Sequence, residues 1–386
     1  MPIKVVTFGC RLNTYESEVI KKFLENKFKN KEIIIFNTCT VTDESEKQLK
    51  QSIRKHKREN PNAIIIAVGC AIDANRETYE NMSEINFILG NKEKMNILNY
   101  KILGEIDDKQ DSFISDFTDR TRAFVKIQDG CDNHCTFCAT RLARGKSISV
   151  DPSHIIQQIN KLNKYNEITL TGVNITDYGK GLDIGLGQLI KEIIKETNLK
   201  RIRLSSLDIY GINDDLKEIL FNENRVMPHV HLSLQSGDDT ILKKMNRRHN
   251  RHDVIKFLDE YKKYRKNAGI GADFIAGFPT ETNEMHKNTF RLIEEAGIVY
   301  GHIFPYSIRK NTPAALMPQT AVNIRRERAK ELRDLCRQQF EKFTTEQLKL
   351  PQKILVENEK QGRTENYLLV KLDKNKKYEV GSVLEL

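Results

Sequence analysis

Short β-branched runs alternate with amphipathic helical stretches along most of this 386-residue chain. Parallel strands need a crossover between them, and a helix is the usual one, so this alternation predicts parallel sheets. In residues 1–103 it predicts one small α/β domain. Its predicted strands are Ile3–Phe8, Glu32–Asn37, Ala63–Val68 and Ile85–Leu89, with helices near Glu16–Phe28 and Asp43–Asn60.

The same alternation resumes after a polar segment. Residues 104–121 carry several aspartates and no sustained apolar period, which predicts a linker. Residues 122–320 then contain six strand-like runs with helical stretches between most of them, and these predict an open, partial barrel. The six predicted strands are Ala123–Ile127, Glu167–Leu170, Arg201–Leu204, His229–Leu234, Ile270–Ile275 and Val299–Phe304.

The last part of the chain is predicted to be a basic helix followed by a short β module. Residues 321–350 form one helical pattern rich in arginine, and Pro351 ends it. Residues 351–386 alternate in strand-like pieces at Lys353–Glu357, Tyr367–Leu372 and Ser382–Leu386. The expected fold class is therefore α/β, with a parallel N-terminal domain, a central partial (β/α)6 barrel and a small C-terminal β module.

Charge and cysteine content narrow the classes of function. The formal net charge of +10 and the pI of about 9.1 favour a polyanionic partner such as nucleic acid. No apolar run approaches the roughly 18 residues of a membrane-spanning helix, and the first residues lack the pattern of a secretion signal. We therefore expect a cytoplasmic protein with no membrane role. In a reducing compartment, an odd number of cysteines, seven, indicates metal binding or catalysis rather than disulfides.

The clearest chemical signal is the C-x3-C-x2-C group Cys131, Cys135 and Cys138, which follows the first predicted barrel strand. Three thiolates there can hold three irons of a [4Fe–4S] cluster and leave the fourth open to the amino and carboxylate groups of S-adenosylmethionine. A structural zinc site is the alternative. It needs four closed ligands, and His134 is too near its neighbours in sequence to be a natural fourth. A four-cysteine ferredoxin pattern would need a further nearby cysteine, which this segment lacks.

Three other cysteines, Cys10, Cys39 and Cys70, are far apart in sequence, but each follows a predicted strand of the N-terminal domain. The carboxyl ends of parallel strands share one edge of a sheet, where ligand sites gather, so the three thiols are expected to converge. Gly9 and Gly69 would let the backbone approach a bulky inorganic group. Any one of these cysteines alone would be interpreted as a buried structural residue. Their equivalent positions favour a second metal centre.

With both cysteine sets in place, the chain resembles the methylthiotransferases. These are radical S-adenosylmethionine enzymes with an N-terminal cluster-binding domain, a central barrel and a C-terminal RNA-binding β module called TRAM. The resemblance covers nearly the whole chain. The matching segments are FGCRLNTYESE (8–18), FNTCTV (36–41), VGCA (68–71), QDGCDNHCTFC (128–138), LTGVNI (170–175), HLSLQSGDDTILKKMNRRH (231–249), DFIAGFPTET (273–282) and PYSIRKNTPA (305–314).

The resemblance implies two [4Fe–4S] clusters and S-adenosylmethionine as cofactors. Cys10, Cys39 and Cys70 match the ligands of an auxiliary cluster that carries the sulfur. Cys131, Cys135 and Cys138 match those of the cluster that cleaves S-adenosylmethionine. The implied cleft for cofactor and substrate contains Phe137, Thr171, Gly172, Asn174, Ser205, Gln235 and Asp273, and no catalytic residue is assigned beyond the cluster ligands.

Two features of the chain depart from the family pattern. Residues 139–145 read ATRLARG, where the family usually has an Ile-Ile-Pro-Tyr-like run before Arg-Gly, so no path is predicted for this loop. The module at 351–386 is shorter than usual, although VENEKQGRTENYLLV (356–370) resembles the TRAM signature.

Within the family, the FGCRLNTYESE and QDGCDNHC segments are most similar to the branch that acts on N6-threonylcarbamoyladenosine, at adenosine 37 beside the anticodon of tRNA. The branches acting on isopentenyladenosine or on a ribosomal-protein aspartate remain alternatives, as does a non-catalytic iron–sulfur protein that binds RNA. The implied reaction replaces the C2–H of adenine with a methylthio group, which requires radical chemistry. The expected partners are the tRNA anticodon loop and an electron donor of the flavodoxin or ferredoxin type, with the sulfur source left open.

Overall fold

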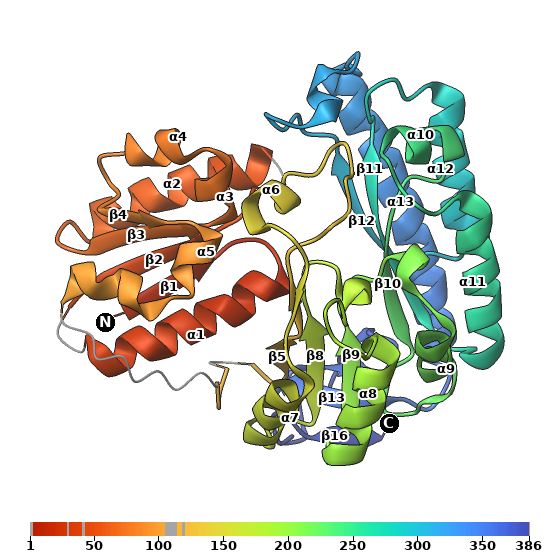
Figure 1. Cartoon of the computed structure of the whole chain (residues 1–386). Helices are drawn as coiled ribbons and strands as arrows, with labels where there is room; N and C mark the ends of the chain where they lie inside the picture. The colour runs from red at the N-terminus through yellow and green to blue at the C-terminus, as the bar shows by residue number, and fades with distance from the viewer. Residues whose placement is uncertain (1–2, 29–30, 41–42, 105–113, 118–119, 386) are drawn as a thin grey trace.

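The N-terminal part of the chain is an α/β domain around a parallel sheet (Figure 1). The structure, a computed structural model, describes residues 3–28, 31–40, 43–104, 114–117 and 120–385. The sheet has the order β1 (Ile3–Thr7), β2 (Ile33–Thr38), β3 (Ile64–Gly69) and β4 (Phe87–Leu89), and every neighbouring pair is parallel. The parallel sheet predicted from the alternation is confirmed.

Two long helices cover opposite faces of this sheet. Ile20 and Leu24 of α1 (Arg11–Lys27) share a core with Ile33 and Ile35, whereas α2 (Asp43–Glu59) packs on the neighbouring positions of β2 and β3. Strands covered on both faces are apolar at every position, which explains the run IIIF in β2. Helix α1 begins five residues before the predicted start, directly after Cys10. Short elements complete the domain: α3 (Cys70–Ala74), α4 (Arg76–Glu80), α5 (Asn91–Lys94) and η1 (Ile97–Leu103).

The central part is an open half-barrel of six parallel strands, as the sequence predicted. Strands β5 (Ala123–Lys126), β8 (Glu167–Thr171) and β9 (Arg201–Leu204) form one sheet. Strands β10 (His229–Gln235), β11 (Gly269–Ala276) and β12 (Tyr300–Pro305) form the other. A bridge between Leu207 and Leu232 joins the two sheets.

Helices pack on the outside of the barrel and leave polar side chains inside it. Val230, Leu232 and Leu234 of β10 belong to the main core with the outer helices. Because side chains alternate along a strand, His229 and His231 face the interior. The outer helices are α7 (Pro152–Lys161), α8 (Leu186–Glu196), α9 (Asp214–Asn222), α10 (Asp239–Lys244), α11 (Arg251–Tyr264) and α12 (Asn283–Glu295). Smaller elements are β6 (Gln128–Asp129), α6 (Thr140–Arg144), β7 (Ile148–Ser149), η2 (Ile175–Asp177), η3 (Ile209–Gly211) and η4 (Pro313–Leu316).

The described end of the predicted linker belongs to the barrel core. Ile114 and Phe117 are both buried. The amide of Gln158 bonds the backbone of Ile114, and the hydroxyl of Tyr165 accepts a hydrogen bond from the backbone N–H of Phe117. Residues 105–113 and 118–119 of the predicted linker lie outside the described residues.

The basic helix α13 (Val322–Gln347) turns several of its arginines inward. Arg328 is buried and donates to Glu281 Oε2 at 2.8 Å, and Arg325 is buried and donates to the carbonyl of Tyr306 at 3.1 Å. Arg333 donates to the carbonyl of Ile303 at 2.7 Å. These cations fasten α13 to the barrel, so the basic character of this helix is only partly a surface property.

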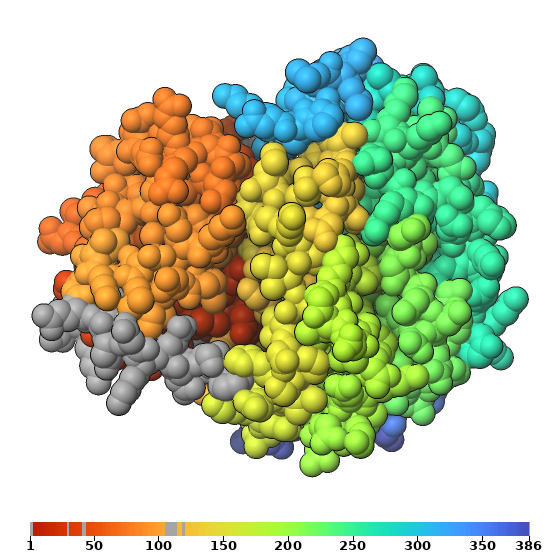
Figure 2. All heavy atoms as spheres, viewed as in Figure 1, coloured from red at the N-terminus to blue at the C-terminus, as the bar shows by residue number. Residues whose placement is uncertain are grey.

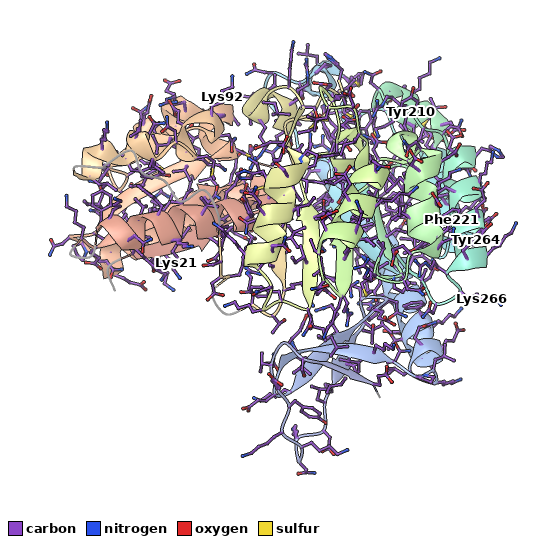
Figure 3. The ribbon with its side chains drawn as sticks, turned by 60° about the horizontal axis from the view of Figure 1, so that its bottom comes forward. Lys21, Lys92, Tyr210, Phe221, Tyr264 and Lys266 are labelled. Atoms are coloured by element: carbon purple, nitrogen blue, oxygen red, sulfur yellow. The ribbon has the colours of Figure 1, made fainter. Side chains whose placement is uncertain are left out.

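The C-terminal module is a small antiparallel sheet packed on one end of the barrel (Figure 3). Its order is β15 (Leu369–Lys371), β14 (Gln361–Thr364), β13 (Lys353–Asn358) and β16 (Val383–Glu385). Strand β14 was not predicted, because QGRT has no apolar alternation. Arg203 of β9 donates to the carbonyls of Thr364 and Glu365 at 2.8 and 2.9 Å, so the module is fastened to the barrel wall by buried polar contacts.

We expect a chain that ends at Leu350 to have an apparent melting temperature lower by at least about 5 °C. The truncation removes Glu357, which pairs with Arg122 at 2.7 Å, and the two carbonyls that satisfy buried Arg203. Thermal unfolding followed by circular dichroism measures the change. Replacing exposed Lys374, Lys376 and Lys377 with Gln is the control and should leave the melting temperature unchanged. A truncated chain as stable as the full one would contradict the prediction.

Candidate functional site

The structure places Cys10, Cys39 and Cys70 at the same edge of the N-terminal sheet. Cys10 follows β1 as the N-cap of α1, Cys39 follows β2, and Cys70 is the first residue of α3 after β3. Gly9 has φ +94°, and a Cβ there would lie 2.7 Å from Sγ of Cys39. Glycine is therefore needed at this position both for its backbone conformation and for the space that the neighbouring thiol takes.

The second set, Cys131, Cys135 and Cys138, lies in the loop between β6 and α6, and all three residues are half-buried. The backbone N–H of Asn133 donates to Sγ of Cys131 at 3.4 Å, and Arg247 Nη1 donates to Sγ of Cys135 at 3.4 Å. Donors aimed at sulfur suit thiolate ligands. Burial, with the negative charge of Asp177 as a smaller cause, raises the pKa of the Cys131 thiol to about 11, so a bound cation is what would hold it ionised.

The compact group of potential metal ligands among the described residues contains no cysteine. Among the described residues, one group of three potential metal ligands has all its ligand atoms within 4.8 Å of one another, and it is His231, Asp273 and His302. Neither cysteine set is that compact. Three thiolates around an iron–sulfur cube lie farther apart than three ligands of one zinc ion, so a set of three cysteines need not be that compact to hold a [4Fe–4S] cluster. Cys336 is buried in α13 and belongs to the main hydrophobic core of the barrel.

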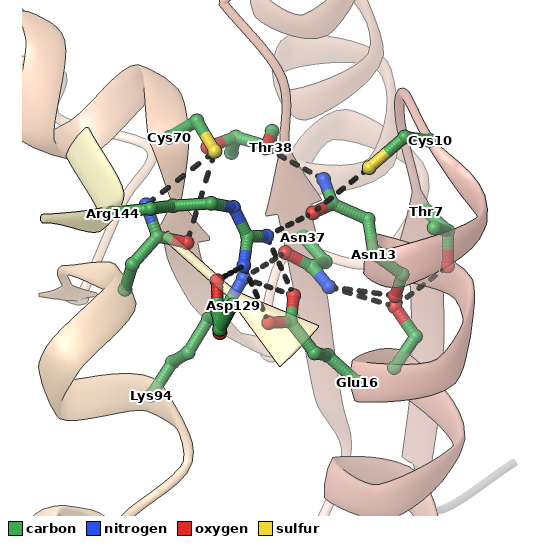
Figure 4. Close-up of polar contacts among 12 residues, drawn as sticks. Thr7, Cys10, Asn13, Glu16, Asn37, Thr38, Cys70, Lys94, Asp129 and Arg144 are labelled. Carbon is green, nitrogen blue, oxygen red and sulfur yellow. Dashed lines mark hydrogen bonds and ion pairs between the residues drawn. The ribbon is translucent and has the colours of Figure 1, made fainter. Parts of the chain in front are cut away.

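A buried ion pair joins the two cysteine regions through α6. Arg144, at the end of α6, donates to Oε1 and Oε2 of Glu16 in α1 at 2.8 and 2.9 Å (Figure 4). The same carboxylate contacts Lys94 Nζ at 2.6 Å, and Asp129 contacts Arg144 at 2.9 Å. The segment that carries the Cys131 set and α6 therefore lies directly against the N-terminal domain, which the space-filling view also shows (Figure 2).

Two asparagines connect this ion pair to the cysteines. Oδ1 of Asn13 accepts from Arg144 Nη2 at 2.7 Å and lies 3.9 Å from Sγ of Cys10. Nδ2 of Asn91 lies 3.4 Å from Sγ of Cys70 and 3.2 Å from the carbonyl of Ala143, next to Arg144 in α6. Asn13 and Asn91 thus connect α6 to the thiols of Cys10 and Cys70, two of the three in the N-terminal set.

Part of the predicted cleft lies at the carboxyl end of β8. Oε1 of Gln128 accepts the backbone N–H groups of Val173 and Asn174, each at 2.9 Å. Its Nε2 donates to the carbonyl of Gly130 beside the Cys131 loop at 2.7 Å. Gly172 packs so closely on Gln128 that a Cβ would lie 2.8 Å from its Oε1. Gln128 therefore ties the predicted residues Thr171, Gly172 and Asn174 to the cysteine loop.

Other predicted residues end the neighbouring strands. Ser205 follows β9 and Gln235 ends β10 with φ +71°, a conformation that costs energy for a residue other than glycine. The amide Nδ2 of Asn174 and the hydroxyl of Ser205 are buried and have no hydrogen-bond partner among the described residues. Orphaned polar atoms at strand ends fit a site for a polar cofactor such as S-adenosylmethionine.

Phe137 and Asp273 occupy different surroundings. The ring of Phe137 packs edge-on against Phe278 with centroids 6.5 Å apart. Asp273 lies farther down β11, where Oδ1 is 3.0 Å from Nε2 of His231 and 3.3 Å from Nδ1 of His302. Burial opposes ionisation of Asp273, but its hydrogen bonds to the two histidines outweigh this and lower its pKa.

Several polar residues of the site were not predicted from the sequence. They include Asn13, Glu16, Gln128, Arg144 and Asp208, of which Asp208 accepts from Asn133 in the cysteine loop at 3.0 Å. The first four lie within or near the two cysteine motifs, which is the one signal that could have singled them out. Their partners lie in other parts of the chain.

Comparison with known proteins agrees with this architecture. A model of the Radical SAM superfamily matches residues 125–293, and one described as Uncharacterized protein family UPF0004 matches residues 2–90. A solved radical S-adenosylmethionine methyltransferase from Kitasatospora setae, TsrM, has a TM-score of 0.59 at 13% identity, covering 81% of this chain and 75% of that one. This likeness shows a shared fold.

Curated relatives decide the family. The threonylcarbamoyladenosine tRNA methylthiotransferase MtaB of Rickettsia prowazekii is 46% identical over 96% of this chain and 91% of its own length. The chain belongs to the methylthiotransferase family. MtaB of Aquifex aeolicus is 32% identical over the full length of both proteins. Among the described parts of this family member, no helix is both long and apolar enough to cross a bilayer.

We expect Glu16→Gln to lower the stability of the metal-free protein at pH 7 by about 3 kcal/mol. Burial opposes ionisation of Glu16, but Lys94 and Arg144 outweigh it and lower the pKa of Glu16 to about 2 from 4.5. A depressed carboxyl pKa stabilises the fold above about pH 4.5, and this contribution is lost as pH falls towards 2.

Urea unfolding at pH 7 and at pH 3 tests this. The variant should lose more stability at pH 7 than at pH 3, whereas Glu25→Gln, which removes an exposed partner of Lys21, should change neither value. An equal loss at both pH values would show that the charge of Glu16 is not the cause.

Proposed function

We propose that this chain is a radical S-adenosylmethionine enzyme that adds a methylthio group to C2 of N6-threonylcarbamoyladenosine at position 37 of tRNA. Family membership carries the proposal, because the two MtaB relatives named above match nearly the whole chain and are named for this activity. The structure adds two separate cysteine sets, each with three thiols and polar support. The enzyme uses two [4Fe–4S] clusters and S-adenosylmethionine.

We assign the cluster at Cys131, Cys135 and Cys138 to cleavage of S-adenosylmethionine and the one at Cys10, Cys39 and Cys70 to the sulfur. When bound, these groups supply the radical and the methylthio unit. The side chains of the protein hold these groups in position. Arg144 and Glu16 hold the two regions together, and the strand-end residues Asn174 and Ser205 offer polar atoms to the cofactor.

The same reasoning extends to the partners. An unstacked adenine in an anticodon loop can enter a barrel interior, which a base in a paired stem cannot do. We also propose that a flavodoxin or ferredoxin type of protein reduces the clusters and that the enzyme works in the cytoplasm.

Anaerobically reconstituted protein should contain about eight irons per chain, since each set of three thiolates can hold one four-iron cluster. Replacing Cys131, Cys135 and Cys138 together with Ala should reduce this to about four, as measured by iron analysis and the visible absorbance of the clusters. Cys336→Ser is the control and should keep the full iron content. An unchanged iron count in the triple variant would refute the assignment.

Expressing the chain in a bacterial strain that lacks its own enzyme of this type should restore the methylthio derivative of N6-threonylcarbamoyladenosine in total tRNA. Mass spectrometry of nucleosides measures it. A form with Cys10, Cys39 and Cys70 replaced by Ala should restore none, yet still cleave S-adenosylmethionine in vitro. If dimethylallyladenosine became methylthiolated instead, the substrate proposed here would be wrong.

A further inference from the structure

Five arginines gather at the end of the barrel that the C-terminal module closes. We call this group, with Tyr367 at its centre, the arginine cluster; its guanidinium groups belong to Arg11, Arg122, Arg201, Arg203 and Arg363. The guanidinium carbons of Arg363, Arg203, Arg11 and Arg122 lie 4.4, 5.0, 5.8 and 5.9 Å from the centroid of the Tyr367 ring. The ring of His229 in β10 stacks on the ring of Tyr367, with the two centroids 4.7 Å apart.

The cluster contains more cations than paired carboxylates. Glu167 contacts Arg122 and Arg203 at 2.8 Å and Arg201 at 2.9 Å. Glu357 contacts Arg122 and Arg363 at 2.7 and 2.8 Å. These two carboxylates therefore serve four of the five guanidinium groups, and Glu365 adds only a longer-range attraction to Arg201.

Two guanidinium groups show the deficit of negative charge. Arg201 is buried, with 4% of its side chain exposed, and its Nη1 and Nη2 have no hydrogen-bond partner among the described residues. Arg11 has no carboxylate partner within the described part of the chain. Its Nη2 donates to the hydroxyl of Tyr367 at 3.3 Å.

The chemistry of Tyr367 agrees with this positive environment. Burial raises the pKa of a phenol, yet the neighbouring arginines, Arg11 first among them, outweigh burial and lower the pKa of Tyr367. Tyr367 also has φ +78°, a conformation that a tyrosine adopts only when its surroundings enforce it. The module thus holds its ring inside the cluster.

Arg11 connects the cluster to the site of reaction. It is the first residue of α1 and directly follows Cys10, while its side chain reaches Tyr367 of the C-terminal module. A base that reacts beside Cys10 would therefore have a half-buried cation within reach of its substituents.

We propose that Arg11, supported by Tyr367, binds the carboxylate of the threonylcarbamoyl group on the target adenosine. This rests on the function proposed above. The threonyl carboxylate is the anion that enters the barrel with the base, at the far end of the N6 substituent. An isopentenyl group carries no charge and would leave Arg11 without a carboxylate partner. RNA phosphates, the other source of negative charge, stay on the backbone outside the barrel.

Two anticodon stem-loop RNAs test this, one with N6-threonylcarbamoyladenosine and one with its threonyl methyl ester. The wild-type, cluster-loaded enzyme should bind the acid about tenfold more tightly than the ester, measured by fluorescence anisotropy. Arg11→Gln should bind both with equal affinity, at the level of the wild type with the ester. Arg11→Lys should recover part of the preference. Lys21→Gln, which changes a half-buried lysine of the same helix that pairs with Glu25 (Figure 3), should behave as the wild type.

Cluster absorbance and S-adenosylmethionine cleavage without RNA are measured for every variant, and Lys21→Gln should match the wild type in both. If Arg11→Gln loses iron, Tyr367→Phe serves as the test variant instead. This substitution removes the hydroxyl oxygen to which Arg11 donates, so it should reduce the preference for the acid.

Three results would overturn the proposal: no preference in the wild type, a preference that survives Arg11→Gln, or an equal loss of affinity for acid and ester, which would indicate a phosphate contact. Failure of the proposed function is a separate result, seen as absence of methylthiolation of the acid RNA by the wild type.

Discussion

The buried ion pair between Arg144 and Glu16 holds the two halves of the active region in one arrangement. An ionised carboxylate is costly to bury, and here it is compensated by two cations, Lys94 from its own domain and Arg144 from the barrel segment. If the domains separated, the Glu16 carboxylate would lose the two hydrogen bonds that Arg144 donates to it, and Arg144 would lose a buried partner. A hydrophobic interface could slide, but an interface with matched buried charges has one favourable register.

This constraint explains why the surrounding residues are polar although they are buried. Asn13 and Asn91 each contact a thiol on one side and α6 on the other. A cluster bound by Cys10, Cys39 and Cys70 would therefore lie beside side chains that are held in place by hydrogen bonds to α6. The ATRLARG segment, whose path was left open by the sequence, forms α6 and brings Arg144 to these side chains.

Much of the fold was predictable because its signals are local. The ten parallel strands of the N-terminal domain and the barrel are mostly β-branched or apolar runs. A cysteine that follows a strand is placed by the sheet topology alone. Strand β14 was missed because Gly362 and its polar neighbours have no apolar alternation, and Ile114 and Phe117 were missed as isolated apolar residues in a polar segment. The pairing of Glu16 with Arg144 could not be predicted, since it joins residues 128 positions apart and each looks like an ordinary surface charge. The roles of the cysteines and strand-end residues stay predictions.

The contact between Arg11 and Tyr367 spans 356 positions, almost the length of the chain. During synthesis the N-terminal domain emerges first and can fold as a unit. The barrel, in contrast, lacks Tyr367 and the carbonyls that satisfy Arg203 until nearly the last residue has been made. A chain released early would therefore expose unpaired arginines in an unfinished barrel.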